Sequence, residues 1–454
     1  MPMLLPPEWS DRLALDRAHV WHPFTQMKVH EADPPVAIIG GEGCYLLLAN
    51  GERVLDGISS WWTCLHGHGH PRLVSALERQ AARLDHAMFA GFTHEPALEL
   101  VARLRRKLPA NLTRAFFSDD GSTAVEVALK MAFQAQLQRG EQGRDRFGAL
   151  RGGYHGDTLG AVGVGELENF MTALFKPLLL ACERLEVPED PRHDVHPDLT
   201  GWPWRLEDAR QEMRQFFTTH GERLAAFIAE PLIQCAGGMR LWPPELLQEL
   251  RSQCDAHGVY LILDEVATGF GRTGTFLACE QAGVQPDLLC LSKGLTGGTL
   301  PLSMTWATEE IYSHFWGEPS SGRAFLHGHS YTANPTACAV ACASLALFDE
   351  EAVLAHAAAI HDAMTAAFSA LAEHPAVRQA RVLGTIGACR LVDPATGLAH
   401  DSEDRFGWNL HRRALDHGLL VRPIGDCLYL MPPMNTPPGR IGEVGAILER
   451  LLTP

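Results

Sequence analysis

Two short apolar runs, each followed by a charged residue, place the strongest constraint on what this chain can fold into. Residues 259–263 are apolar throughout and precede Asp264, and residues 288–291 precede Ser292 and Lys293. Apolar runs of four or five residues are typical of strands that are buried on both faces of a sheet. A carboxylate at the end of a buried strand needs a partner, because an unpaired buried charge is costly. The sequence therefore predicts two strand ends that present one acid and one amine.

Lys293 stands apart from the other lysines of the chain. It follows a predicted buried strand and precedes Gly294, Gly297 and Gly298, which allow another group to approach the backbone closely. The remaining lysines lie in helical, polar or proline-flanked sequence: Lys28, Lys107, Lys130 and Lys176. One interpretation is a solvated lysine in a loop between a strand and a helix. The sharper interpretation is a lysine that forms a Schiff base with pyridoxal phosphate, with Asp264 as the partner of the pyridinium nitrogen.

Strands and helices alternate between residues 114 and 302, which predicts an α/β fold with a mostly parallel sheet. In such sheets, ligands bind beyond the carboxyl ends of the strands. Six candidate site residues fall at such ends: Gly121, Ser122, Tyr154, Glu230, Asp264 and Lys293. Their agreement in position favours a ligand site at this edge of the sheet.

Gly121 and Ser122 open a helix directly after a predicted strand, where free backbone N–H groups and the helix dipole suit a phosphate. The alternative is a plain helix N-cap by Ser122, which by itself is the commoner case. Tyr154 lies in the segment GGYHGDT at another strand end, and it either stacks on a planar cofactor or packs locally. Residues 160–205, which are rich in proline, are expected to form loops near this pocket.

The pattern along the chain divides it into three parts. Residues 1–70 are irregular apart from a hairpin with a turn at Asn50-Gly51, and we expect them to pack with the smaller domain and the active site. Residues 71–334 are expected to form a large α/β domain that binds the cofactor. Residues 335–454 mix helical and strand patterns and are expected to form a smaller α+β domain.

Aromatic and histidine clusters precede the large domain. Trp61 and Trp62 follow two serines, and they either belong to the core or wall a pocket for an apolar substrate. The segment HGHGH contains His66, His68 and His70, but no second cysteine or carboxylate follows at the usual ligand spacing. No metal site is therefore predicted.

Charge and cysteine usage restrict the surroundings of the chain. The formal net charge is −16 and no basic run is present, which argues against nucleic acid and anionic membranes as partners. The longest largely apolar run, residues 337–348, is too short to span a bilayer, and the N-terminus lacks the basic start of a signal peptide. The 11 cysteines lack paired ligand spacing, which predicts reduced thiols and a cytoplasmic location.

Several motifs together resemble a known enzyme family. DEVATGFGRTG and SKGLTGG are similar to the class III aminotransferases of fold type I, which depend on pyridoxal phosphate. WHPFTQM, SSWW, GGYHGDT, HGHSYTANP and RPIG…YLMPP resemble the branch of that family that acts in biotin biosynthesis. The resemblance covers nearly the whole chain. It implies transfer of an amino group to 8-amino-7-oxononanoate, which gives 7,8-diaminononanoate.

The resemblance implies a role at the cofactor for each matching residue. Lys293 would hold pyridoxal phosphate covalently, Asp264 would pair with its ring nitrogen, and Tyr154 would lie near the ring and the substrate. The implied phosphate ligands come from both subunits of a homodimer with shared active sites: Gly121 and Ser122 from one subunit, and His329 and Ser330 from the other.

The resemblance also implies substrate-binding residues: Phe24, Trp61, Trp62, Tyr154, Gly328, Arg422 and Tyr429. The tryptophans would bury the alkyl chain of the substrate. The planar guanidinium of Arg422 would grip the substrate carboxylate through two hydrogen bonds. The alternative interpretation of Arg422 is a surface arginine after a short strand.

The motifs point to different amino donors. Relatives that use S-adenosylmethionine commonly have Tyr in place of Phe24 and Pro-Thr in place of His329-Ser330, so these positions indicate lysine as the donor. Trp61-Trp62 indicates S-adenosylmethionine, which we take as the expected donor.

Two other functions stay open from the sequence. Another class III enzyme, such as an ω-amino acid aminotransferase, would share Asp264 and Lys293 but lack the paired tryptophans and the RPIG segment. An inactive cofactor-binding scaffold is expected to lack the lysine or its acid partner. Cys235 stands where ornithine and GABA aminotransferases have a glutamate, which argues against glutamate as the donor.

Overall fold

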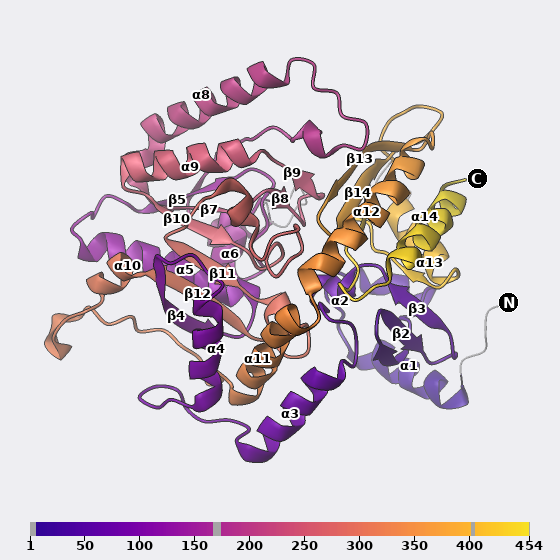
Figure 1. Ribbon diagram of the computed structural model, residues 1–454, viewed down its shortest axis with the longest axis horizontal. Helices are drawn as coiled ribbons and strands as arrows, with labels where there is room; N and C mark the ends of the chain where they lie inside the picture. Colours follow the sequence, from indigo (N-terminus) through magenta and orange to yellow (C-terminus); the bar gives the residue numbers. More distant parts are fainter. Residues whose placement is uncertain (1–5, 167–173, 401–404, 454) are drawn as a thin grey trace.

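The apolar runs of the central part of the chain pair into one seven-stranded sheet (Figure 1). The computed structural model describes residues 6–166, 174–400 and 405–453. The strands of this sheet are, in spatial order, β4 (Leu112–Ser118), β12 (Ser303–Thr308), β11 (Leu288–Leu291), β10 (Tyr260–Asp264), β7 (Leu224–Ala229), β5 (Arg146–Leu150) and β6 (Cys182–Leu185). β12 is antiparallel to both of its neighbours, and the other pairs are parallel. The predicted α/β fold with a mostly parallel sheet is therefore confirmed.

Helices cover both faces of this sheet. Tyr260 of β10 packs on one face with α5 (Gly121–Gln138), and Leu261 packs on the other face, because successive side chains of a strand alternate. The core of the second face includes residues of four helices: α4 (Glu95–Arg105), α8 (Trp202–His220), α9 (Pro244–His257) and α11 (Pro335–Glu350). By the same alternation, Asp264 at the end of β10 points to the side of the sheet on which α5 lies.

The expectation of loops over residues 160–205 is wrong for part of this segment. β6 pairs in parallel with β5 at the edge of the sheet. β6 lacks an apolar run because an edge strand is partly exposed, and its Glu183 forms an ion pair with Arg146 of β5. The helix α6 (Leu159–Val164) and the start of α8 also fall in this segment. Residues 167–173 lie outside the described part of the chain.

Two smaller sheets, of four and three strands, lie beside the large one, in the right half of Figure 1. The first contains, in order, β1 (Ile38–Glu42), β2 (Tyr45–Leu48), β3 (Arg53–Asp56) and β15 (Leu419–Leu420). The second contains β13 (Val377–Leu383), β14 (Ile386–Leu391) and β16 (Cys427–Leu430). The predicted turn at Asn50-Gly51 joins β2 to β3, and Gly51 has the positive φ of 88° that such a turn favours. β15 pairs in parallel with β3, so the end of the chain completes the N-terminal sheet.

The other described elements connect and flank these sheets. The helices are α1 (Pro7–His19), α2 (Ser59–Trp62), α3 (Pro71–Arg83), α10 (Glu309–His314), α12 (Val353–Ala372), α13 (Phe406–Leu415) and α14 (Pro438–Leu452). The short pieces are the strands β8 (Ile233–Gln234) and β9 (Arg240–Leu241) and the 3-10 helices η1 (Met27–Glu31), η2 (Lys176–Leu178), η3 (Pro191–His193), η4 (Gly221–Arg223), η5 (Ala278–Ala282), η6 (Lys293–Thr296) and η7 (Pro319–Ser321). Among the described residues, no helix has the length and apolar character that crossing a membrane requires.

Two separate cores bear on the predicted domain organisation. Side chains of α11 pack in the core of the large sheet, whereas α14 and most buried side chains of α12 pack with β13 and β14 in a second core. Leu55 of β3 and Leu419 of β15 belong to that second core. The division into residues 1–70, 71–334 and 335–454 remains our proposal. The packing of α11 against the large sheet favours a boundary between the large and small domains that lies closer to α12.

The loop after η6 approaches α2 so closely that a side chain has no room at Gly298. A Cβ atom there would lie 2.7 Å from the carbonyl carbon of Thr63 and 2.8 Å from the backbone nitrogen of Cys64. Gly298 also has a φ of 81°, which side chains disfavour. Gly283 has a similar positive φ of 62°, but nothing lies within 4 Å of a Cβ atom at that position.

We expect Gly298→Ala to destabilise the chain more than Gly283→Ala. Both variants place a side chain on a residue with positive φ, but only Gly298→Ala also forces two backbone segments apart. The extra loss should be roughly 1–3 kcal/mol in the free energy of unfolding. Urea denaturation of both variants at one protein concentration measures the difference. Equal midpoints for the two variants would contradict the close approach of the two segments.

Candidate active site

The two tryptophans of α2 lie on a left-handed turn. Ser59, Ser60, Trp61 and Trp62 have φ values of 50°, 46°, 69° and 71°. Such a run of positive φ is costly for residues with side chains and persists only where the surroundings hold it. Ser59 Oγ donates to the carbonyl oxygen of Met431 at 2.7 Å, which ties the turn to the segment after β16.

This turn directs the two indole rings into two different cavities. Trp62 is buried, donates from Nε1 to the hydroxyl of Tyr429 at 3.1 Å, and lines a cavity that contains Lys293. Trp61 is 42% exposed and lines a neighbouring cavity that contains Arg422. The sequence left open whether the two tryptophans belong to the core or line a pocket. Trp62 is buried and also lines a pocket, and Trp61 lines a pocket only.

The first cavity, of about 130 Å³, brings together seven of the residues predicted from the sequence. These are Trp62, Gly121, Ser122, Tyr154, Glu230, Asp264 and Lys293, and the cavity is completed by Asp120, His155, Gly156, Val266 and Ala267. They come from the ends of β4, β5, β7, β10 and β11, together with α2 and the start of α5. The prediction that the carboxyl ends of these strands share one site agrees with this arrangement.

Asp264 has two protein partners at the end of β10. Its Oδ2 lies 2.8 Å from Nδ1 of His155, and its Oδ1 accepts a hydrogen bond from the backbone N–H of Val266 at 3.0 Å. His155 is buried, and its Nε2 has no partner among the described residues. We expected the partner of Asp264 to be a ligand and missed His155. The sequence signal was its place beside Tyr154 in GGYHGDT, directly after a strand.

Lys293 begins η6 in a left-handed conformation, with a φ of 46°. Its Nζ lies 4.8 Å from the ring centroid of Trp62. Burial lowers the pKa of Lys293, while Asp264 and Cys235 act in the opposite direction. A lowered pKa increases the fraction of neutral amine, which is the nucleophilic and proton-accepting form.

Glu230, at the end of β7, is the second buried acid of this cavity. Its carboxylate accepts hydrogen bonds from the backbone N–H groups of Tyr154 at 3.2 Å and Cys235 at 3.0 Å. Burial raises the pKa of Glu230 to about 7, with His155 lowering it and Asp264 raising it. Glu230 therefore positions the backbone of Tyr154, whose own phenol pKa is raised, first by burial and next by Asp157.

The N-terminus of α5 opens into the same cavity, and its cap is not Ser122. Asp120 is the N-cap and accepts from the backbone N–H of Thr123 at 2.9 Å. Ser122 instead accepts from the N–H of Asp157 at 3.1 Å, and a Cβ atom at Gly156 would collide with its hydroxyl. The plain-cap interpretation of Ser122 is therefore wrong. The start of α5 presents backbone N–H groups to the cavity, as an anionic group requires.

The second cavity, of about 270 Å³, contains Arg422 between two aromatic rings. The guanidinium carbon lies 5.7 Å from the ring centroid of Trp61 and 5.5 Å from that of Trp408. Burial lowers the pKa of Arg422, and no acidic side chain among the described residues forms an ion pair with it. Phe24 is exposed and meets Trp61 edge-on at 5.5 Å. A half-buried cation without an acidic partner is suited to binding an anion.

The loop that carries Gly328, His329 and Ser330 lies outside both cavities. Gly328 and Ser330 are exposed, and Nε2 of His329 lies 3.8 Å from Oδ1 of Asp119. The single chain therefore does not bring these three predicted residues to its own Lys293.

The histidines of HGHGH each have a separate partner. Nε2 of His66 lies 3.0 Å from the hydroxyl of Ser344, and Nε2 of His68 lies 2.9 Å from a carboxylate oxygen of Asp56. Nε2 of His70 lies 3.2 Å from a carboxylate oxygen of Glu351, the residue that follows α11. Burial lowers the pKa of His66 to about 3. The pKa of His68 is raised to about 10, because the hydrogen bonds of its ring outweigh its burial.

Comparison with known proteins agrees with this geometry. The family model described as aminotransferase class-III matches residues 26–452 of the chain. The chain is 47% identical, over 440 residues, to the adenosylmethionine-8-amino-7-oxononanoate aminotransferase of Synechococcus elongatus, which covers 96% of this chain and 98% of that protein.

Solved structures give the same result. The adenosylmethionine-8-amino-7-oxononanoate aminotransferase of Methanocaldococcus jannaschii superposes with a TM-score of 0.91 at 34% identity, over 98% of this chain and 99% of that one. An amine transaminase from an uncultivated Pseudomonas species, solved in its PLP-bound form, has a TM-score of 0.86 at 32% identity, over 95% and 98% of the two chains. The family resemblance predicted from the motifs is confirmed, and the chain belongs to the class-III aminotransferases.

Proposed function

We propose that this chain transfers an amino group to 8-amino-7-oxononanoate, giving 7,8-diaminononanoate for biotin biosynthesis. The observation that carries the proposal is Arg422, a half-buried guanidinium without an acidic partner among the described residues, set between two indole rings beside the lysine cavity. A substrate with a long apolar chain, a ketone near one end and a carboxylate at the other fits two cavities that are lined by the adjacent residues Trp61 and Trp62. The names of the relatives support the same substrate.

The cofactor in this proposal is pyridoxal phosphate, and the residues of the first cavity fit it. When bound, it supplies a protonated ring that takes up the electrons of a carbanion. Asp264 would hold the ring nitrogen, with His155 orienting its carboxylate, and the N-terminus of α5 at Gly121 and Ser122 would bind the phosphate. Two glycines leave room for a bound group here. A Cβ atom at Gly121 would lie 2.7 Å from Cγ1 of Val266, and a Cβ atom at Gly156 would collide with the hydroxyl of Ser122.

The side chains around the reacting groups have distinct tasks. Nζ of Lys293 would attach the cofactor and later accept the proton from the amine-bearing carbon of the donor. Burial lowers the pKa of Lys293, which favours the neutral amine that both tasks require. Tyr154 would face the ring and the substrate, held by the bond from its N–H to Glu230. Trp62, fixed by Tyr429, would exclude water from one side of the cavity. Phe24 and Trp61 would cover the alkyl chain of the substrate.

We propose S-adenosylmethionine as the amino donor, with lysine as the alternative. Trp61-Trp62 and the names of the relatives support the first, whereas Phe24 and His329-Ser330 support the second. We also propose that the enzyme acts in the cytoplasm. The 11 cysteines, all within the described residues, form no disulfide, as expected in a reducing compartment.

We propose further that two chains share their active sites. Gly328, His329 and Ser330 lie on an exposed loop outside the cavities of their own chain. Large apolar side chains are exposed on both sides of this loop, with Leu326 at 89% and Tyr331 at 64%, which is typical of a surface covered by another protein. From a second chain, His329 and Ser330 would reach the phosphate and Gly328 the substrate.

Amino transfer to 8-amino-7-oxononanoate tests the function directly. The holoenzyme is expected to form 7,8-diaminononanoate with S-adenosylmethionine, as followed by mass spectrometry, and Lys293→Ala is expected to lose turnover by several orders of magnitude. Borohydride should fix the cofactor on Lys293, and Lys176→Ala, at an exposed lysine, serves as the control. Product with lysine alone would reassign the donor. Turnover only of ω-amino acids with pyruvate would contradict the proposed substrate.

Replacement of Arg422 tests the carboxylate contact. If Arg422 binds the substrate carboxylate, loss of a charge-assisted contact worth roughly 1.5–3 kcal/mol should lower kcat/KM for the amino acceptor by about 10- to 150-fold in Arg422→Ala. The half-reaction with the amino donor should change much less. Arg422→Lys should recover only part of the loss, because an ammonium lacks the planar fork. Single-turnover kinetics of each half-reaction measures both effects, and equal losses in both halves would indicate a structural role instead.

Mixing two inactive variants tests the shared sites. Lys293→Ala subunits and His329→Ala/Ser330→Ala subunits should each be inactive alone. Mixed after dissociation, they should regain activity, because one of the two sites in a hybrid dimer would be intact. Mass spectrometry verifies that hybrids form. Proven hybrids without activity would show that each chain completes its own site.

A further inference from the structure

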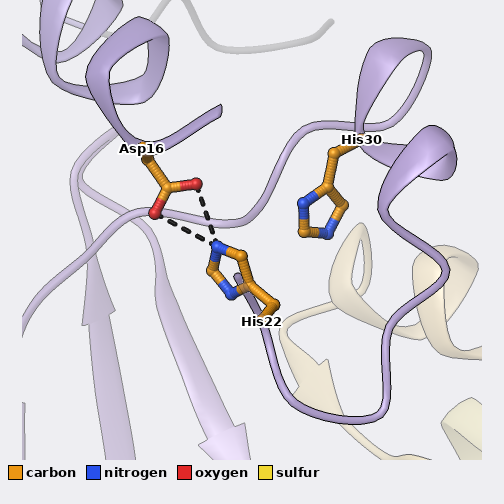
Figure 2. Close-up of side chains that lie close together, drawn as sticks. All are labelled: Asp16, His22 and His30. Atoms are coloured by element: carbon orange, nitrogen blue, oxygen red, sulfur yellow. Dashed lines mark hydrogen bonds and ion pairs between the residues drawn. The ribbon is translucent and has the colours of Figure 1, made fainter. Parts of the chain in front are cut away.

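Three potential metal ligands converge near the N-terminus, away from Lys293. Asp16 belongs to α1, His22 follows that helix, and His30 belongs to η1. Their ligand atoms all lie within 4.8 Å of one another, and no other group of three or more histidine, cysteine or acidic side chains in the described part of the chain meets this condition. Figure 2 shows the three side chains approaching one another from these segments.

The polar atoms of this cluster are incompletely paired. Nε2 of His22 lies 2.9 Å and 3.1 Å from the two carboxylate oxygens of Asp16. His30 is only 5% exposed, its ring meets that of His22 edge-on at 4.8 Å, and its buried Nδ1 has no hydrogen-bond partner among the described residues. Figure 2 shows a nitrogen-bearing edge of the His30 ring turned toward Asp16 and His22. A buried imidazole nitrogen without a partner is costly unless a ligand satisfies it.

The charges around the cluster act in both directions on a cation. Among the described residues, the carboxylate of Asp16 forms no ion pair with an arginine or lysine, so its negative charge is available. The other nearby acid, Asp33, is already engaged by Arg412 at 2.7 Å and by Nε1 of Trp408 at 2.9 Å. Arg412 is thereby compensated, which reduces its repulsion of a cation in the same cavity, whereas Arg422, which lines that cavity without an acidic partner among the described residues, acts against a cation.

We propose that Asp16, His22 and His30 form a three-ligand site for a divalent transition metal of the zinc class. Two imidazole nitrogens and one carboxylate oxygen suit Zn²⁺, Co²⁺ or Ni²⁺ and not Mg²⁺. Ligand atoms of a tetrahedral zinc site lie about 3.4 Å apart, so side-chain rotations that move these atoms by about 1 Å would bring them to the distances that zinc requires. His22 and His30 line the cavity of about 270 Å³ that also contains Arg422, which gives an ion and its remaining water ligands a route in.

A metal at this site would fix a segment that matters for the substrate cavity. It would join α1 to η1 and so hold both ends of the intervening loop. That loop carries Phe24, which has a positive φ of 49° and contacts Trp61. The backbone N–H of His22 already donates to the sulfur of Met27 at 3.4 Å across the same loop. The site itself does not depend on the proposed function.

Zinc binding to the untagged holoenzyme tests the proposal. After removal of metals with a chelator, equilibrium dialysis and isothermal titration with ZnCl₂ are carried out in a buffer with a non-chelating reductant. We expect the wild-type chain to bind one more Zn²⁺ than His22→Ala/His30→Ala. Asp16→Asn, which can keep a hydrogen bond to His22, should weaken binding by at least about 100-fold, because even the loss of an outer-shell partner costs roughly 10- to 100-fold. His19→Ala, at an exposed histidine of the same helix, is the matched control and should bind as the wild type does.

Two further measurements keep the test decisive. Co²⁺ in the wild-type chain should give ligand-field bands at longer wavelengths than the cofactor absorbs, and these bands should be absent from the double histidine variant. Zn²⁺ should raise the Tm of the wild type and of His19→Ala, and should leave the Tm of the double variant unchanged. Equal zinc stoichiometry and affinity in wild type and double variant, or no zinc binding by a folded wild type, would overturn the proposal.

Discussion

The close approach between the loop after η6 and the turn of α2 is the constraint on which the rest of the site depends. The backbone at Gly298 lies so close to Thr63 that any side chain there would displace the segment that carries Trp62 relative to the segment that carries Lys293. Trp62 is also bonded to Tyr429 of β16. Three distant stretches of sequence thus meet at one point, and the positive φ values of α2 are maintained because all three are fixed.

Burial of several ionisable groups in one small cavity gives the site its electrostatic character. The charge of Asp264 disfavours the charged form of Glu230, and His155 acts against that effect. Desolvation has opposite consequences for the two types of group: it raises the pKa of Glu230 and lowers the pKa of Lys293. The cavity therefore favours low total charge, and the proposed cofactor would bring a protonated ring to Asp264 and an anionic phosphate to the start of α5.

Much of the fold was readable because it follows local chemistry. The runs that became β7 and β11 are apolar without interruption, and α9 begins at Pro244 and ends before Gly258, where a proline and a glycine favour the two ends of a helix. β6 escaped prediction because an edge strand needs no apolar run. The positions of Asp264 and Lys293 could be predicted because residues at the end of a buried strand, or just after it, lie at that edge of the sheet. The partner His155 could not, since contact between separate strand ends depends on their order in the sheet, which no local pattern contains.

The pairing of β15 with β3 has a consequence for how the chain acquires its structure. β3 leads directly into the turn of α2, yet its parallel neighbour is synthesised only after nearly the whole chain has emerged. During synthesis the large sheet can fold first, while the edge of β3 lacks its neighbour and the tryptophans after it lack their tie to Tyr429. Truncation near the C-terminus would therefore remove the N-terminal wall of the active site, although no N-terminal residue had changed.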